Sequence, residues 1–153
     1  MGKMISEVER AYIAGLIDAD GAIMALIERH QEKKFGFRVR IQVKLTQKDP
    51  FILRWIKDKL KIGNVRSNRT TFDWLTRDQN EISRLLKLLQ KFLIIKKKQA
   101  EMALQILATP IDSKKDLLKA ARLADTLSFS NPRSKNRRKN FATKIEEIIS
   151  PND

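Results

Sequence analysis

The stretch YIAGLIDADGAI, residues 12–23, predicts a helix that ends in two acidic residues. A capping box that begins at Ser6, together with the apolar run that follows it, predicts a helix over 6–20, which the next residue, a glycine, closes. Asp18 and Asp20 fall in its last turn, where the negative end of the helix dipole makes each carboxylate cost about 0.3 to 1 kcal/mol. Stability therefore does not explain why acid stands there.

Downstream of this helix, apolar and polar residues alternate in FRVRIQVKL, residues 37–45, which predicts a strand with one apolar and one wet face. The polar loop that precedes it makes residues 22–29 its hairpin partner. Capping, turn and periodicity signals predict the remaining elements. These are a helix over 49–63, strands over 64–67 and 71–76, helices over 78–90, 97–109, 114–127 and 141–149, and a loop over 128–140.

This order of elements predicts an α+β fold with the pattern αββαββα and extra C-terminal helices. Four strands form one antiparallel sheet, with helices on one face and the other face wet. We expect one domain over residues 1–153, with its core over about 5–128 and a basic segment over 129–153.

The charge balance favours a polyanionic partner. The chain has 32 Lys and Arg against 18 Asp and Glu, a formal net charge of +14. A solvated surface or adaptation to a thermophilic host would also give a basic excess, but six basic residues and no acid lie between Arg133 and Lys144. We expect no membrane partner, because the basic clusters lack a neighbouring amphipathic helix, and no small-molecule substrate. An intracellular, soluble protein is expected, in the cytoplasm of a prokaryote or in an organelle.

Residue usage narrows the chemistry that the chain can perform. It has no cysteine, which excludes disulfides, thiolate metal sites and cysteine nucleophiles. Its single histidine, His30, excludes a histidine zinc cluster and, in practice, a Ser-His-Asp triad. Carboxylates remain as the plausible metal ligands.

A strip of small residues on the first helix suggests how such carboxylates are used. Ala11, Gly15 and Ala19 are spaced by four, which lets a second helix approach closely. If another copy of the chain supplies that helix about a two-fold axis, the aspartates Asp18 and Asp20 of both copies converge. Carboxylates so close together must be neutralised by protons or by a cation, and we expect a divalent metal ion in this role.

The wet strand face favours DNA. Its residues are Arg38, Arg40, Gln42 and Lys44, types that read base edges and phosphates, although a charged solvent face explains them equally well. Gln47 favours the DNA-binding interpretation over the solvent face. It lies at a position where the alternation predicts an apolar residue, and polar residues that break such a pattern are often functional.

The nonapeptide IAGLIDADG, residues 13–21, resembles the LAGLIDADG motif of homing endonucleases and differs from it only at the first position. LTQK at 45–48, FDWL at 72–75 and FLIIKKKQA at 92–100 are similar to segments of intron-encoded, single-motif members. The resemblance implies a homodimeric, site-specific endonuclease that hydrolyses double-stranded DNA at a long pseudo-palindromic target. It also implies Mg²⁺ as the cofactor, with Mn²⁺ as a substitute. An RNA maturase, or a DNA-binding protein without cleavage activity, is the alternative.

The resemblance further implies residue roles. Asp20 and the carbonyl of Ala19 would bind the metal, Gln47 would help to organise the attacking water, and Lys96 would stabilise charge at the phosphate. Asp18 would have a structural role at the helix end. The basic part of the site departs from the family pattern, because an arginine of some relatives is missing after the glutamine, where Asp49 and Pro50 stand; Lys48 and Arg54 are its candidate substitutes.

The remaining expected residues fall into two groups. DNA contacts are expected from Met24, Leu26, Glu28, His30, Lys33, Arg38, Arg40, Gln42, Lys44, Lys48, Arg66, Asn68, Asp73, Lys98, Lys135, Arg137, Arg138 and Lys139. The tail residues of this group would mainly hold phosphates, whereas the strand residues would mix base and phosphate contacts. The dimer interface is expected at Ala11, Ala14, Gly15, Asp18 and Ala19.

Overall fold

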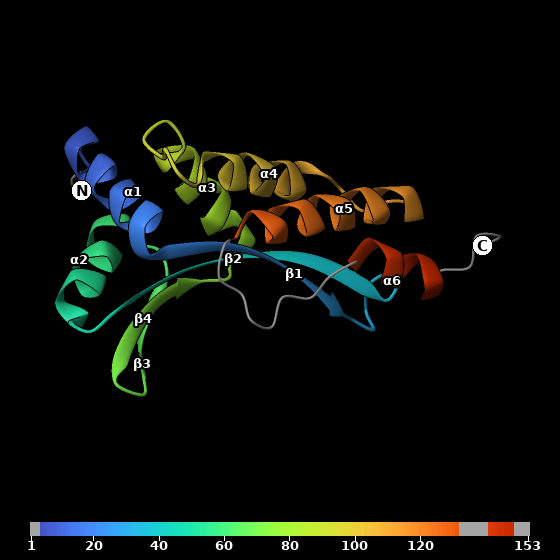
Figure 1. Cartoon of the computed structure of the whole chain (residues 1–153), viewed down its shortest axis with the longest axis horizontal. Helices are drawn as coiled ribbons and strands as arrows, with labels where there is room; N and C mark the ends of the chain where they lie inside the picture. Colours follow the sequence, from blue (N-terminus) through green and yellow to red (C-terminus); the bar gives the residue numbers. More distant parts are fainter. Residues whose placement is uncertain (1–3, 132–140, 149–153) are drawn as a thin grey trace.

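The computed structural model describes residues 4–131 and 141–148. Four strands form one antiparallel sheet in the order β1-β2-β4-β3. The elements are α1 (Glu7–Asp20), β1 (Gly21–Arg29), β2 (Phe37–Gln47), α2 (Pro50–Leu60), β3 (Asn64–Asn68), β4 (Thr71–Thr76), α3 (Gln79–Leu89), α4 (Lys97–Ala108), α5 (Lys114–Ser130) and α6 (Phe141–Ile148). Figure 1 shows α3, α4 and α5 together on one face of the long β1–β2 part of the sheet. The predicted α+β class and element order are confirmed.

Helix α1 passes into β1 without a loop. Ser6 and Glu9 form the capping box at its start, with bonds of 3.0 and 3.1 Å. At its end, a Cβ on Gly21 would lie 2.8 Å from Cα of Ile17, so only glycine lets the strand leave this close to the last turn. The aspartate that ends α1 is thereby fixed at the edge of the sheet.

The β1–β2 hairpin separates its residues into two faces. The pairs Ile23–Val43 and Ala25–Ile41 are buried under the helices. The opposite face, which we call the outer face, carries the pairs Met24–Gln42, Leu26–Arg40 and Glu28–Arg38. In β3 and β4 the same face carries Asn64, Arg66, Asn68, Asp73 and Leu75, by their register with the outer residues of β2.

The β3–β4 hairpin is anchored through a buried tryptophan. Trp74 is fully buried and its Nε1 donates to the carbonyl of Ile62 at 2.9 Å. Gly63 crosses directly over the ring with φ +82, where a Cβ would lie 2.5 Å from Nε1 of Trp74. This close approach fixes the turn between α2 and β3.

Some predicted boundaries differ from the structure. The helix predicted over 49–63 ends at Leu60, because Lys61 takes a left-handed conformation. Helix α5 runs to Ser130, so the first residues of the loop predicted over 128–140 are helical, and 132–140 lie outside the described residues. Among the described residues, no helix combines the length and the apolar character needed to cross a membrane.

Candidate active site and nucleic-acid interface

Asp20 and Gln47 lie together where α1 and β2 end. Gly21 pairs with Leu45, so the residues just before Gly21 lie beside the residues just after Leu45. Nε2 of Gln47 donates to Oδ2 of Asp20 at 3.0 Å. Asp20 is exposed, and no other described residue donates to its carboxylate. The structure therefore presents an oriented carboxylate to solvent at the edge of the outer face.

Asp18 has a different environment from Asp20. Its carboxylate is buried and accepts the backbone N–H groups of Ile94, Ile95 and Lys96 at 2.7, 3.2 and 3.0 Å. These bonds tie the segment before α4 to the end of α1, which agrees with the structural role expected for Asp18. The carboxylate is used within the chain, and the place of Asp18 in a dimer interface stays a prediction.

Lys96 also lies at the end of α1. Its side chain is mostly buried, with 8% of the residue exposed, and Nζ donates to the carbonyl of Asp18 at 2.7 Å. A cation at the C-terminal end of a helix is stabilised by the dipole. The structure thus brings Lys96 to the helix end that carries Asp20, where its ammonium group is bonded to the backbone carbonyl of Asp18. The catalytic role of Lys96 stays a prediction.

The donor atoms at this edge suit a hard divalent cation. They are the carboxylate of Asp20 and the carbonyl of the exposed Ala19, both oxygen ligands of the kind that Mg²⁺ prefers, and the side chain of Gln47 is hydrogen-bonded to Asp20 beside them. Among the described residues, no group of three or more His, Cys, Asp or Glu could hold a metal. One chain therefore offers part of a coordination shell, which fits an ion that keeps waters and takes further oxygens from phosphate.

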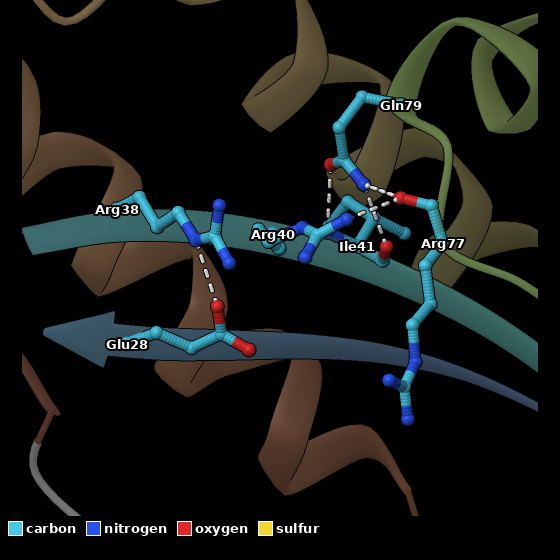
Figure 2. A network of polar contacts seen from close by, with 6 residues as sticks. All are labelled: Glu28, Arg38, Arg40, Ile41, Arg77 and Gln79. Atoms are coloured by element: carbon cyan, nitrogen blue, oxygen red, sulfur yellow. Dashed lines mark hydrogen bonds and ion pairs between the residues drawn. The ribbon is translucent and has the colours of Figure 1, made fainter. Parts of the chain in front are cut away.

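Arginines on the outer face are held by the chain itself. Nε of Arg38 donates to Oε2 of Glu28 across the strands at 2.7 Å, which leaves the two terminal nitrogens of its guanidinium pointing elsewhere (Figure 2). Arg40 donates to the carbonyl of Arg77 at 2.9 Å. Gln42 is only 7% exposed, which differs from the solvent-facing reader predicted.

Asp73 is buried rather than facing a ligand. It is 0% exposed and accepts from Thr46 Oγ1 and, at 3.0 Å, from Nδ2 of Asn68. Nε of the exposed Arg66 lies 3.7 Å from its carboxylate. The prediction that Asp73 contacts DNA directly therefore differs from the structure, where it holds two exposed β3 residues on the outer face.

The other predicted DNA residues have varied positions. Met24, Leu26, Glu28 and Lys44 are half-buried on the outer face, and Lys33, Lys48, Arg66, Asn68 and Lys98 are exposed. Lys98 lies on α4 rather than on the sheet. His30 is half-buried in the hairpin loop, where its Nδ1 has no partner in the described chain. Lys135, Arg137, Arg138 and Lys139 lie outside the described residues.

The small-residue strip of α1 faces outward. Ala11, Gly15 and Ala19 are exposed, and a Cβ on Gly15 would meet nothing within 4 Å. Ala14 is 0% exposed in the chain's own core, so its side chain has no surface left for a partner, unlike the prediction. Large exposed apolar side chains, Val8 and Tyr12, flank the strip on the same helix.

Sequence reasoning did not single out Arg77 and Gln79, which form part of the network in Figure 2. Arg77 has the parity of Asp73 and Leu75, a signal that could have placed it on the outer face. The side-chain amide of Gln79 forms hydrogen bonds with the backbone of Ile41, 38 positions away, and no local sequence pattern predicts that contact.

Comparison with known proteins supports one family. A family model described as LAGLIDADG endonuclease matches residues 13–107. The DNA endonuclease I-CreI of Chlamydomonas reinhardtii is 35% identical over 100 residues, which are 63% of this chain and 60% of I-CreI. The DNA endonuclease I-CvuI of Chlorella vulgaris is 31% identical over 128 residues, 80% of each chain.

Solved structures agree with this likeness. A structure of I-CvuI in complex with the I-CreI target superimposes with a TM-score of 0.83 and 29% identity, covering 92% of both chains. The archaeal intron-encoded endonuclease I-Vdi141I, complexed with DNA, shares the fold with a TM-score of 0.81. The matched motif, the fold and these relatives together show that the chain belongs to the LAGLIDADG endonuclease family.

Proposed function

We propose that this chain is a site-specific endonuclease that hydrolyses double-stranded DNA as a homodimer at a long pseudo-palindromic target. The observation that carries the proposal is the pair Asp20 and Gln47, an exposed and oriented carboxylate at the edge of a sheet face rich in arginine. Solved structures of I-CvuI in complex with a DNA target, in the presence of Mg or Ca, support this proposal.

The chain's own residues would prepare the phosphate for attack. Asp20 and the carbonyl of Ala19 would hold a divalent cation, Mg²⁺ with Mn²⁺ as a substitute, which supplies charge neutralisation and a lowered pKa of water when bound. Gln47 uses its amide N–H to fix Asp20, which leaves its oxygen to orient a water. Lys96 adds positive charge at the same helix end.

A homodimer follows from the incompleteness of the site in one chain. Among the described residues, each copy offers the oriented carboxylate of Asp20 and no cluster of three metal-binding side chains, and two copies would supply one such site for each strand of a duplex. The exposed Ala11, Gly15 and Ala19 would let the α1 helices of two copies pack closely about a two-fold axis. That axis would bring both copies of Asp20 to the centre of a site with two-fold symmetry.

The outer face would then read DNA. An antiparallel ribbon fits the major groove, where Arg38, Arg40 and Lys44 could reach base edges and the exposed Arg66 and Asn68 would add contacts from β3. The predicted phosphate contacts of the basic tail, Lys135 to Lys139, belong to this proposal.

Selection from a random duplex library tests the proposal. The purified chain is incubated with the library and magnesium, and cut molecules are captured and sequenced. We expect one long, nearly palindromic consensus, no cutting in chelator, and restored cutting with manganese. Binding to a consensus that is never cut would support the DNA-binding alternative, and the absence of any selected duplex would contradict the proposed function.

A further inference from the structure

A hydrogen-bond network joins the start of α3 to the middle of β2 (Figure 2). The register between β4 and β2 ends at the pair Thr76–Val43, whereas β2 itself extends to Phe37. Gln79 occupies the next position along β2. Its Oε1 accepts from the backbone N–H of Ile41 and its Nε2 donates to the carbonyl of Ile41, both at 2.9 Å. The side-chain amide thus makes the two bonds that a neighbouring strand residue would make.

The same amide fixes a backbone carbonyl that supports an arginine. Nε2 of Gln79 donates to the carbonyl of Arg77 at 2.7 Å, and a terminal nitrogen of Arg40 donates to that carbonyl at 2.9 Å. Arg40 lies on the outer face, opposite Leu26. One of its donors is therefore anchored, and the others have no partner in the described chain and can face a ligand.

The side chain of Arg77 is free to bind a ligand. Arg77 is exposed and follows β4 with the parity of Asp73 and Leu75, which places it toward the outer face. Figure 2 shows its guanidinium extending away from Gln79. Among the described residues, none forms a hydrogen bond or ion pair with this guanidinium.

We propose that Arg77 is a further DNA contact of this chain, which binds a backbone phosphate, and that Gln79 is the positioning residue that fixes both Arg77 and Arg40. Arg77 stands at the edge of the β1–β2 ribbon that β4 leaves uncovered. When a ribbon lies in a groove about 12 Å wide, its outer face meets base edges and its edges face the phosphate backbones. The inference rests on the proposed function, because it assumes that the outer face binds duplex DNA.

The salt dependence of binding tests Arg77. Each phosphate contact contributes about 0.9 to the slope of log K against log salt concentration, so Arg77→Ala in a homodimer should reduce the slope by about 1.8. The loss of affinity should be the same for cognate and unrelated duplexes. Arg84→Ala is the matched control, because Arg84 is exposed on α3 in the helix layer and carries the same charge. Equal slopes for Arg77→Ala, Arg84→Ala and the parent would overturn the contact.

A double-mutant cycle tests Gln79. Arg40→Ala alone should lower affinity for the cognate site by about 5- to 150-fold for each half-site and relax preference at one base position in each half-site. Gln79→Leu removes the amide but keeps the side-chain size, and should relax preference at that same position. If Gln79 acts through Arg40, adding Arg40→Ala to Gln79→Leu should cost less than about 2-fold more. Gln105→Leu, on the exposed side of α4, is the control.

The outcomes separate the two roles and the two proposals. If Gln79→Leu lowers the melting temperature but leaves base preference and the full effect of Arg40→Ala intact, Gln79 is merely structural and the positioning role is wrong. A parent protein that neither binds nor cuts any selected duplex would overturn the proposed function. A parent that cuts its site while both variants leave the slope and the preference unchanged would overturn only this inference.

Discussion

The side-chain amide of Gln47 donates a 3.0 Å hydrogen bond to Oδ2 of Asp20 and so joins the last residue of β2 to the last residue of α1. The chain passes from α1 into β1 without a loop, and the β1–β2 register then fixes both residues. An exposed carboxylate at the negative end of a helix is unfavourable on its own, so this oriented arrangement is consistent with a functional demand.

Replacement of Asp20 by Asn should separate DNA binding from cleavage. The variant keeps an oxygen that can accept from Gln47 but loses the charge needed for a metal. Cleavage on both strands should fall below detection, whereas affinity in chelator should hold or rise slightly because two carboxylates no longer repel phosphate. A magnesium time course and a gel-shift titration measure the two effects.

The same variant distinguishes a functional from a structural carboxylate. Removal of an unfavourable charge at the helix end should stabilise the fold by about 0.3 to 1 kcal/mol. Asp18→Asn is the comparison. It replaces one of the two carboxylate oxygens that accept backbone N–H groups before α4 by an amide nitrogen, so it should destabilise the chain. Parent-like cutting by Asp20→Asn would show that Asp20 is not a metal ligand.

Gly15→Leu should disrupt the homodimer without damage to the fold of one chain. A Cβ at Gly15 has open space in its own chain, and leucine favours a helix over glycine by roughly 0.5 to 1 kcal/mol. Between two closely packed α1 helices, however, the larger side chain would push the copies apart. Sedimentation should show a monomer with parent-like circular dichroism. An unchanged dimer would place the interface elsewhere.

Asp73→Ala should cost both stability and specificity. The change leaves the hydroxyl of Thr46 and the amide of Asn68 without their acceptor and frees the neighbouring Arg66, so we expect a loss of about 1 to 3 kcal/mol in the free energy of unfolding. The ratio of cognate to unrelated binding should fall. Asp58→Ala, an exposed α2 residue, is the control with the same charge change. Denaturant titration and competition binding would detect the effects, and a parent-like ratio would contradict this role.

The charge on Glu9 should make stability depend on pH under acid conditions. The pKa of Glu9 is lowered from 4.5 to about 2, chiefly by the hydrogen bond from Lys59 and then by the backbone N–H of Ser6. A lowered pKa in the folded state contributes stability above the unfolded pKa, and that stability is lost as pH falls from 4.5 toward 2. Glu9→Gln keeps a capping-box amide without the charge. Its stability should therefore approach that of the parent as pH falls through this range, as measured by denaturant titration at several pH values. If the difference in the free energy of unfolding between the parent and Glu9→Gln stays constant with pH, the charge on Glu9 has no effect on stability.

Helix starts could be predicted better than helix ends. Ser6, Asp49 and Asp78 cap their helices through side chains only a few residues away, so the signal lies in the local sequence. The end of α2 depended instead on a left-handed Lys61 and on the passage of the following glycine over Trp74. Such ends are set by packing against segments that the local pattern does not contain.

By itself, the sequence determined the order of the elements, the two faces of the strand over 37–45, and a motif that ends in Asp20. These follow from caps, from period-two alternation and from local chemistry. Only the tertiary structure decided that Asp73 and Gln42 are covered on the outer face and that Gln79 completes the edge of β2. The physical reason is that alternation fixes the direction of a side chain, whereas its burial and its hydrogen-bond partners depend on which distant segment the register places beside it.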